Sequence, residues 1–252
     1  MIILTTAVGY SPGGLAIFWD SLMETGYSGK VVVVSNDCEV LRKRGATIIP
    51  VPYKQYPISL TRHFAYKDYL KDIDEPVVLT DVRDVVFQKN PEEYMPTEGV
   101  NVFLEDASKT IGTCRFNRTW LRSMGINKWD NKNILCAGII SGRLADFTQK
   151  MCEHVKEIYY PPGGDQGVFN DLIYSGYPTI MHDNEDAEAY TVGHIPLESV
   201  KVNEDGFIVN KKGEVPCMVH MYDRHVNLTV SIIKRLNLKV VMEELYEDKI
   251  SV

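Results

Sequence analysis

Two carboxylates and an arginine interrupt a strongly apolar stretch of this sequence. In PVVLTDVRDVVFQKNP (residues 76–91), Asp81, Arg83 and Asp84 lie between two runs of β-branched and aromatic residues. An unpaired carboxylate is costly to bury, so both must be neutralised or lie at a strand end that faces a cleft. In a cleft they could ligate a hard divalent cation. Alternatively, Asp81 caps a turn and Asp84 pairs with Arg83, and the stretch alone leaves both interpretations open.

Two later stretches also carry residues that suit a binding or catalytic site. In GGDQ (163–166), the two glycines would let the backbone approach a ligand closely, beside Asp165 and Gln166. Asp165 could equally be the N-cap of the helix that follows. His220, in MVHMYDRH, follows an apolar segment and could ligate manganese through its imidazole. The alternative is a histidine packed at a strand end and hydrogen-bonded to the backbone.

A third group of candidates lies near the N-terminus. Thr5, Thr6 and Ala7 leave the first apolar run, where a plain strand-to-helix turn would also explain them. Arg62 begins the segment RHFAYKDYL, and its guanidinium is the side chain best suited to bidentate recognition of phosphate. A solvated helix face is the other interpretation of Arg62.

The elements that must position these residues alternate between strand and helix. The spacing of apolar residues predicts strands at 2–6, 31–35, 47–51 and 77–79, and helices at 13–25, 37–44 and 61–70. Such repetition implies right-handed crossovers and helices on both faces of a sheet. Because ligands bind beyond the carboxyl ends of parallel strands, Thr5, Thr6, Ala7 and Asp81 are expected to share one rim.

The second half of the chain has a less regular pattern. A strand is predicted at 100–104, then a loop-rich insertion at 105–133 with a helix near 119–124. Further helices are expected at 144–160, after the glycines of GGDQ, and from Val226. Neither an internal repeat nor a linker is evident. We therefore expect a single α/β domain over residues 1–252, with a Rossmann-like nucleotide-binding half (1–104), a second half (105–225) and a C-terminal helix and tail (226–252).

Composition excludes several classes of protein. The formal charge of −7 argues against sequence-independent nucleic-acid binding, which needs a basic face. A basic, apolar signal peptide is lacking, and no run approaches the roughly 18 apolar residues of a membrane span. The five cysteines are scattered, which fits reduced thiols and a cytoplasmic location better than disulfides or a zinc site. Nothing in the sequence indicates an oligomeric state.

Four stretches in a fixed order carry a family resemblance: VVLTDVRDVVFQKNP, CAGIISG, GGDQGVFNDLIYSG and MVHMYDRH. Over roughly residues 1–225 the chain resembles GT-A fold glycosyltransferases, in particular the small enzymes of bacteria and large algal viruses, and it is distantly similar to the glycogenin-type retaining group. The resemblance implies a mixed central sheet, a UDP-sugar donor, a glycan or other hydroxyl acceptor, and Mn²⁺ or Mg²⁺ as cofactor.

The resemblance also implies roles for single residues. A divalent cation held by carboxylates can stabilise a nucleoside diphosphate leaving group. The implied metal ligands are Asp81, Asp84 and His220, the implied donor-binding residues Thr5, Thr6, Ala7, Arg62, Asp81 and Arg83, and the implied catalytic residues Asp165 and Gln166. The sequence departs from the family's Asp-x-Asp motif, because Asp-Val-Arg-Asp is one residue longer. Retention of configuration is favoured, with Asp165 as an inverting base the alternative.

Two other functions remain open at this point. A nucleotidyltransferase would share the sheet and a metal-bound nucleotide, but it usually has a basic, glycine-rich loop after the first strand, and TTAVGYSPGG contains neither Lys nor Arg. A sugar-nucleotide-binding module without turnover is the second alternative. Donor hydrolysis in the presence of manganese would distinguish it from an enzyme. Acceptor choice is expected to depend on residues 105–133.

Overall fold

The first strand lies inside the larger of the sheets, and the candidate site lies at the end of this strand and of its neighbour. A computed structural model describes residues 1–36, 38–156, 158, 160–184 and 188–238. In it β1 (Ile2–Thr6) pairs in parallel with β2 (Lys30–Val34) and with β4 (Val77–Thr80), and β2 pairs with β3 (Thr47–Ile49). β1 and β4 are buried throughout, as their continuous apolar runs predict for strands covered on both faces.

Three further strands extend this sheet beyond β4. β7 (Asn133–Gly142) pairs antiparallel with both β4 and β6 (Val100–Thr110), and β6 pairs in parallel with β8 (Ile180–His182). The order is β3-β2-β1-β4-β7-β6-β8, so the sheet is mixed. The expected single α/β domain with a mixed central sheet is confirmed.

A second sheet of three short strands stands beside the first. β5 (Val85–Phe87) pairs antiparallel with β12 (Met218–His220), which pairs in parallel with β9 (Ala189–Thr191). Since β4 and β5 are separated by only four residues, the chain passes from one sheet to the other at Asp81–Asp84. β10 (Lys201–Val202) and β11 (Ile208–Val209) form a separate hairpin.

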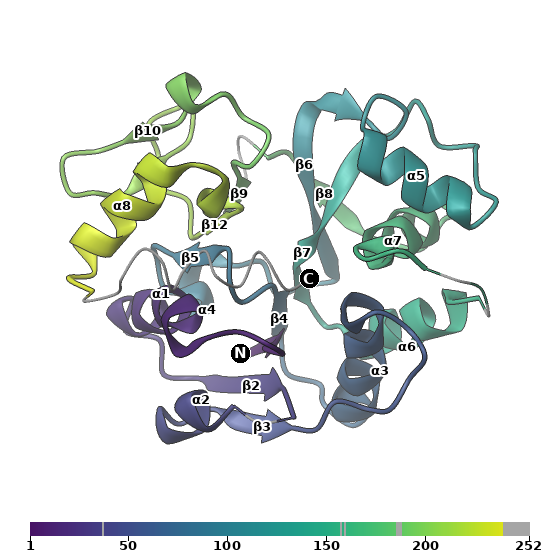
Figure 1. Ribbon diagram of the computed structural model, residues 1–252, viewed down its shortest axis with the longest axis horizontal. Coiled ribbons are helices and arrows are strands. Elements are labelled where there is room, and N and C mark those ends of the chain that lie inside the picture. The colour runs from purple at the N-terminus through teal and green to yellow at the C-terminus, as the bar shows by residue number, and fades with distance from the viewer. Residues whose placement is uncertain (37, 157, 159, 185–187, 239–252) are drawn as a thin grey trace.

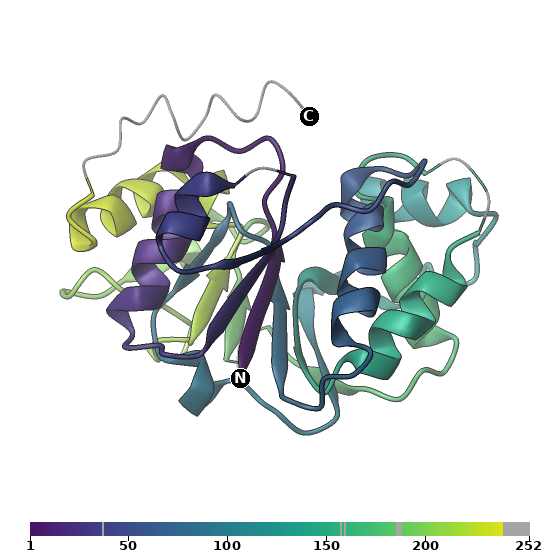
Figure 2. The same cartoon turned by 90° about the horizontal axis from the view of Figure 1, so that it is seen from below.

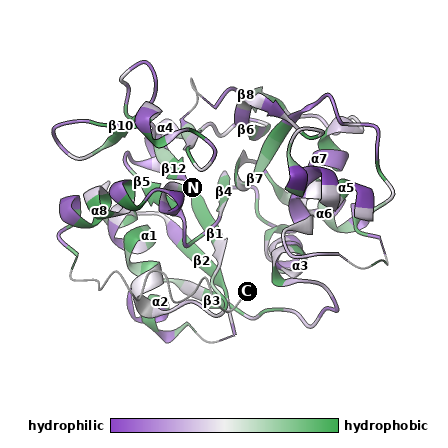
Figure 3. Cartoon of the chain, turned by 45° about the horizontal axis from the view of Figure 1, so that its top comes forward, coloured by the Kyte–Doolittle hydropathy of each residue, from purple (hydrophilic) through white to green (hydrophobic). Residues whose placement is uncertain are grey.

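Helices cover both faces of the central sheet (Figures 1 and 2). Alternate residues of β1 point to opposite faces, so Leu4 packs with Leu60 and Phe147 on one side while Ile3 packs with Phe18 on the other. Figure 3 shows the hydrophobic residues concentrated on the central strands and hydrophilic residues on outer helices such as α5. The helices are α1 (Pro12–Glu24), α2 (Glu39–Lys43), α3 (Ile58–Leu70), α4 (Pro91–Tyr94), α5 (Arg115–Ser123), α6 (Ala145–His154), α7 (Gly164–Tyr174) and α8 (Val226–Arg235), with 3₁₀ turns at Leu197–Ser199 and Tyr222–Arg224.

Several predicted boundaries were wrong. β6 runs to Thr110 rather than ending at 104, because it continues to pair with β7 across irregular register shifts. α5 begins at Arg115, four residues early, and α3 begins directly after Pro57. α6 stops at His154 because Val155 is extended, so the helix predicted to reach 160 is shorter. Residue 37, the expected N-cap of α2, and the tail 239–252 lie outside the described residues.

Two sequence-based expectations concern the whole chain. Within its described part, no helix is long and apolar enough to cross a membrane. All five cysteines are free thiols, and four of them are buried. None of them forms a disulfide cross-link.

Candidate active site

The change of sheet between β4 and β5 places two carboxylates at a strand end. Asp81 follows β4 directly and Asp84 precedes β5. β12 runs antiparallel to β5 with His220 opposite Val85, and the backbone N–H of Met221 donates to the carbonyl of Asp84. The end of β12 is thereby held against the turn, and His220 meets both aspartates although it lies far along the chain.

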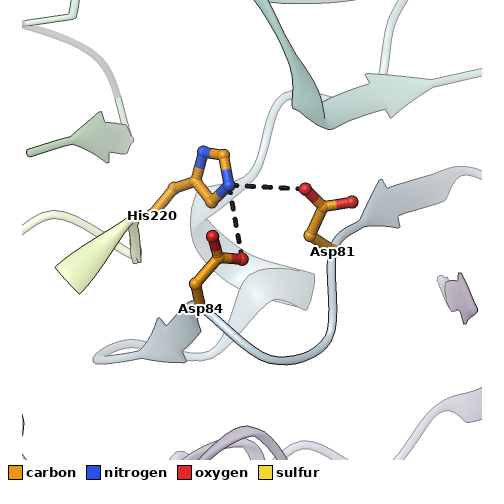
Figure 4. Close-up of side chains that lie close together, drawn as sticks. All are labelled: Asp81, Asp84 and His220. Carbon is orange, nitrogen blue, oxygen red and sulfur yellow. Dashed lines mark ion pairs between the residues drawn. The ribbon is translucent and has the colours of Figure 1, made fainter. Parts of the chain in front are cut away.

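The three side chains converge on one point (Figure 4). His220 Nε2 lies 3.5 Å from Asp81 Oδ2 and 3.5 Å from Asp84 Oδ1, and one ligand atom from each residue falls within 4.8 Å of the others. The His220 side chain is 3% exposed, and its Nε2 has no hydrogen-bond partner among the described residues. A buried nitrogen without a partner, facing two carboxylates, fits a divalent cation that accepts mixed nitrogen and oxygen ligands.

A glycine makes room for this group. A Cβ added to Gly138 on β7 would lie 2.6 Å from His220 Nε2 and 2.9 Å from Asp81 Oδ2. Any side chain at this position would displace the imidazole or the carboxylate. Gly138 therefore belongs to the structure of the carboxylate–histidine group.

Neighbouring residues determine how the histidine ring and its charge behave. Cys136 Sγ lies 3.1 Å from His220 Nδ1, on the side of the ring opposite the aspartates. Burial by itself lowers the pKa of His220, but the adjacent Cys136 and then Asp84 and Asp81 raise that pKa well above its usual value. Burial raises the pKa of Asp84, and His220 reverses this effect and holds the pKa below its usual value. The group thus attracts positive charge.

Arg62 links the aspartates to the start of α7. Its guanidinium donates through Nη1 to Asp81 and through Nη2 to Asp165 Oδ2, the latter at 2.9 Å. Burial raises the pKa of Asp81, but Arg62 and then His220 outweigh it, so that this pKa lies well below its usual range. The pKa of Asp165 is likewise raised by burial and lowered more strongly by Arg62 and by His63, whose Nε2 lies 3.9 Å away.

Three of the alternative interpretations from sequence are therefore wrong. Asp165 does not cap α7, because the N-cap is Gly163 in the left-handed conformation and no side-chain cap forms. Asp81 pairs with Arg62 rather than only capping a turn. Arg83 pairs with Asp223 Oδ2 at 3.3 Å, and no ion pair to Asp84 accompanies it among the described residues.

A cavity of about 410 Å³ lies beside this group. Most of the predicted site residues line it, namely Thr6, Arg62, Asp81, Arg83, Asp84, Asp165 and Gln166. Thr5, Ala7 and His220 do not line it. Thr5 is fully buried within the β1–β2 pairing, and Ala7 and His220 are nearly as buried. Tyr10, Ile58 and Gly163 add apolar wall, and the hydroxyl of Thr6 is hydrogen-bonded to Tyr66 at 2.8 Å.

Sequence reasoning missed some residues that contact the site. Neither His63 nor Cys136 was identified as a site residue, yet His63 lies beside Asp165 and Cys136 lies beside His220. Glu105 and Asn117 were assigned to a loop, yet both accept hydrogen bonds from Gln166 Nε2. The only signal available was the adjacency of His63 to Arg62, because the other contacts form across the tertiary structure.

Comparison with solved structures identifies the fold. The galactosyltransferase LgtC, in complex with donor and acceptor sugar analogues, matches with a TM-score of 0.57 at 14% identity, over 98% of this chain and 100% of that one. An active-site variant of LgtC with glutamine replaced by glutamate gives a TM-score of 0.58 at 14% identity, over 99% and 100%. No family model and no curated protein sequence matches this chain. At this identity the likeness establishes the GT-A fold, as predicted.

Proposed function

We propose that this protein is a metal-assisted glycosyltransferase that moves a sugar from a UDP-sugar to a hydroxyl group of a glycan or related acceptor. One observation carries the proposal: ligand atoms of Asp81, Asp84 and His220 converge within 4.8 Å. The two aspartates line a cavity together with Arg62 and Asp165. The fold adds support, because LgtC is a galactosyltransferase crystallised with donor and acceptor sugar analogues. A nucleotidyltransferase or a sugar-nucleotide-binding module could use the same group and cavity, and the likeness to LgtC favours glycosyl transfer over both.

The metal-binding residues in this proposal are Asp84, Asp81 and His220. The orphaned Nε2 of His220 and the two carboxylates form a donor set that suits Mn²⁺, with Mg²⁺ the alternative. When bound, the cation supplies positive charge to the diphosphate. The extra residue in Asp-Val-Arg-Asp does not separate the carboxylates, because the turn between the two sheets brings both to His220.

The donor-binding residues are those on the cavity wall. Thr6 and Tyr10 are assigned to the nucleoside, and Tyr10 offers an aromatic face to the base. Arg62 and Arg83 are assigned to the diphosphate and the sugar, because both guanidinium groups line the cavity and remain charged. Thr5, within β1, and Ala7, directly after it, support this wall through the backbone and are assigned no side-chain contact.

Retention of configuration suits this geometry better than inversion. A general base works best with a pKa near the operating pH. Asp165 is paired with Arg62 and has a lowered pKa, so its carboxylate is a weak base. In a retaining reaction the leaving phosphate oxygen can take the acceptor's proton instead. Gln166, neutral and on the cavity wall, is assigned to the face of the sugar that becomes electron-poor.

The acceptor is assigned to the side of the cavity where α5 packs behind Pro162 and Gly163. Trp120 donates its indole N–H to the carbonyl of Pro162 at 3.0 Å and packs against Gly163, and both of these residues line the cavity. Phe116, one turn earlier, lies 6.0 Å from Trp120 between ring centroids and is 63% exposed. An aromatic pair with Phe116 exposed and Trp120 partly exposed, next to two residues of the cavity wall, suits the apolar face of a sugar ring.

A thermal-shift panel tests this proposal. UDP-, GDP- and TDP-sugars are added with and without Mn²⁺, because a ligand that binds only the folded state raises the melting temperature. We expect the largest rise with a UDP-sugar together with Mn²⁺. An equal response to every nucleotide, independent of the metal, would contradict it.

A cytoplasmic location is part of the proposal, supported by the five free thiols.

A further inference from the structure

We propose that Glu105 is a positioning residue that orients and polarises the carboxamide of Gln166, so that the carbonyl oxygen of Gln166 faces the cavity. This inference rests on the proposed function only in assigning the cavity to a sugar donor. The pairing itself is a property of the structure.

Glu105 is a buried carboxylate whose two oxygens are both engaged. It lies on β6, is 2% exposed, and accepts from Gln166 Nε2 through Oε2 at 2.8 Å. Its Oε1 lies 2.7 Å from His194 Nε2. An ionised carboxylate only accepts hydrogen bonds, so the group that faces it from Gln166 must be the amide nitrogen.

A second contact fixes the same orientation. Gln166 Nε2 also donates to Asn117 Oδ1 at 3.1 Å, and the amide nitrogen of Asn117 is engaged by Cys114 Sγ at 3.4 Å. The carbonyl oxygen of Gln166 is therefore left to accept from the backbone N–H of Ala137 at 3.3 Å. Ala137 lines the cavity, whereas Glu105 and Asn117 do not. The amide nitrogen of Gln166 therefore points away from the cavity, and its carbonyl oxygen points toward the residues that line it.

The charge of Glu105 adds to this orientation. A hydrogen bond to an ionised partner is stronger than a neutral one, and bonds in a chain polarise one another in a low-dielectric site. Electron density moves from the amide nitrogen toward the carbonyl oxygen, which has a second lone pair free of Ala137. That oxygen is the atom suited to stabilise positive charge that develops on a sugar while its bond to the diphosphate breaks.

Activity and stability test the pairing separately. Glu105→Gln keeps the shape but removes the charge, and we expect kcat to fall roughly tenfold to a hundredfold while the donor and acceptor KM change little. In a Gln166→Ala background the same change should have no further effect on kcat, because Glu105 acts through Gln166. Asp106→Asn, a neighbouring carboxylate that bonds Ser108 instead, is the control with unchanged kcat.

The second measurement needs no turnover. Gln166→Glu places a second carboxylate against Glu105 and should lower the melting temperature by several degrees. The double variant Glu105→Gln with Gln166→Glu restores a hydrogen bond of reversed polarity and should recover most of that loss. The proposal is supported if the melting temperature recovers in the double variant and if the effects of Glu105→Gln and Gln166→Ala on kcat are not additive.

Three results would overturn the proposal. The double variant could fail to recover the melting temperature, or Glu105→Gln could leave kcat unchanged. The third is that Glu105→Gln lowers kcat by the same factor whether residue 166 is glutamine or alanine. If no UDP-sugar is turned over by the unmodified protein, the proposed function fails, while the melting temperatures still decide the pairing. Should Glu105→Gln not fold, Asn117→Ala removes the other acceptor of the same nitrogen and is expected to lower kcat in the same non-additive way.

Discussion

Gly138 is the residue on which the geometry of the carboxylate–histidine group depends most. A methyl group at this position would overlap the ring of His220, with 2.4 Å to its Cε1. We expect Gly138→Ala to weaken the Mn²⁺-dependent binding of UDP roughly tenfold or more, because the ligands can no longer converge. Isothermal titration with and without Mn²⁺ measures this, and the melting temperature checks that the fold survives. Wild-type metal dependence in a folded variant would show that the group holds no metal.

Asp84 is expected to be the stronger of the two aspartate ligands. It is buried and has no arginine partner among the described ion pairs, whereas Asp81 is 32% exposed and shares Arg62. Asp84→Ala should abolish the gain in UDP affinity that Mn²⁺ provides, measured by the same titration. Asp130→Ala, whose carboxylate pairs with Arg122 and does not line the cavity, is the matched control. A retained metal response in Asp84→Ala would remove Asp84 from the ligand set.

Residue types were easier to predict than residue partners. Asp81 and Asp84 were found because carboxylates between apolar runs are costly to bury, and His220 was found because MVHMYDRH follows the order of motifs in the family that the chain resembles. The pairing of Arg62 with Asp165 spans 103 positions, and nothing local distinguishes it from a solvated arginine and a helix cap. The contacts of Glu105 could not be predicted, because the strand was expected to end at residue 104 and Glu105 was therefore placed in a loop.

Helix α5 is the element assigned to the acceptor. Its exposed Phe116 neighbours Trp120, which packs on Gly163 at the edge of the cavity. We expect Phe116→Ala to raise the KM for the acceptor roughly threefold to tenfold, which corresponds to an aromatic contact of about 1 kcal/mol. The rate of donor hydrolysis without acceptor should not change. Thr119→Ala, on an exposed position of the same helix, is the control. A rise in the donor KM instead would assign α5 to the nucleotide.

Helices α6 and α7 are joined by a partly buried contact between a histidine and an aspartate, and this contact should respond to pH. His154 Nε2 lies 2.7 Å from Asp171 Oδ2, and Trp129 donates to Asp171 Oδ1. Burial raises the pKa of Asp171, but these two hydrogen bonds lower it below the usual value. A carboxylate with a lowered pKa in the folded state contributes stability above its unfolded pKa, about 3.9, and this contribution is lost as the pH falls toward the folded value.

We therefore expect Asp171→Asn to be less stable than the unmodified protein at neutral pH, by roughly 1–2 kcal/mol. This difference should shrink as the pH is lowered below about 4. Urea unfolding at several pH values measures it, with Asp68→Asn on α3 as the control. A difference that is constant with pH would show that the charge of Asp171 does not contribute.

The type of most elements could be predicted, whereas several boundaries could not. The runs of β1, β2 and β4 are continuous and apolar, which is typical of strands buried on both faces. The length of β6 depends on bulged pairing with β7, and the end of α6 on a single extended residue, Val155. Such features arise from tertiary contacts, which the local pattern does not record.

The arrangement of the whole chain follows from where the parallel strands end. β1 and β4 are neighbours, so Thr6 and Asp81 share a rim, as the strand–helix repetition predicts. The small sheet β5-β12-β9 was not predicted, because its strands come from distant parts of the chain. This sheet brings His220 to the aspartates. The N-terminal strands thus position the cavity, and the late strand β12 completes the candidate metal site.

The release of UDP from UDP-sugars in the presence of Mn²⁺ tests most directly whether this chain is a glycosyltransferase. We expect steady release of UDP from one UDP-sugar, faster when a glycan acceptor is added, and lost in Asp84→Ala. NMR of the first product should show the anomeric configuration of the donor retained. Tight binding of the nucleotide sugars without any release of UDP, under all of these conditions, would contradict the assignment and would leave a sugar-nucleotide-binding protein instead.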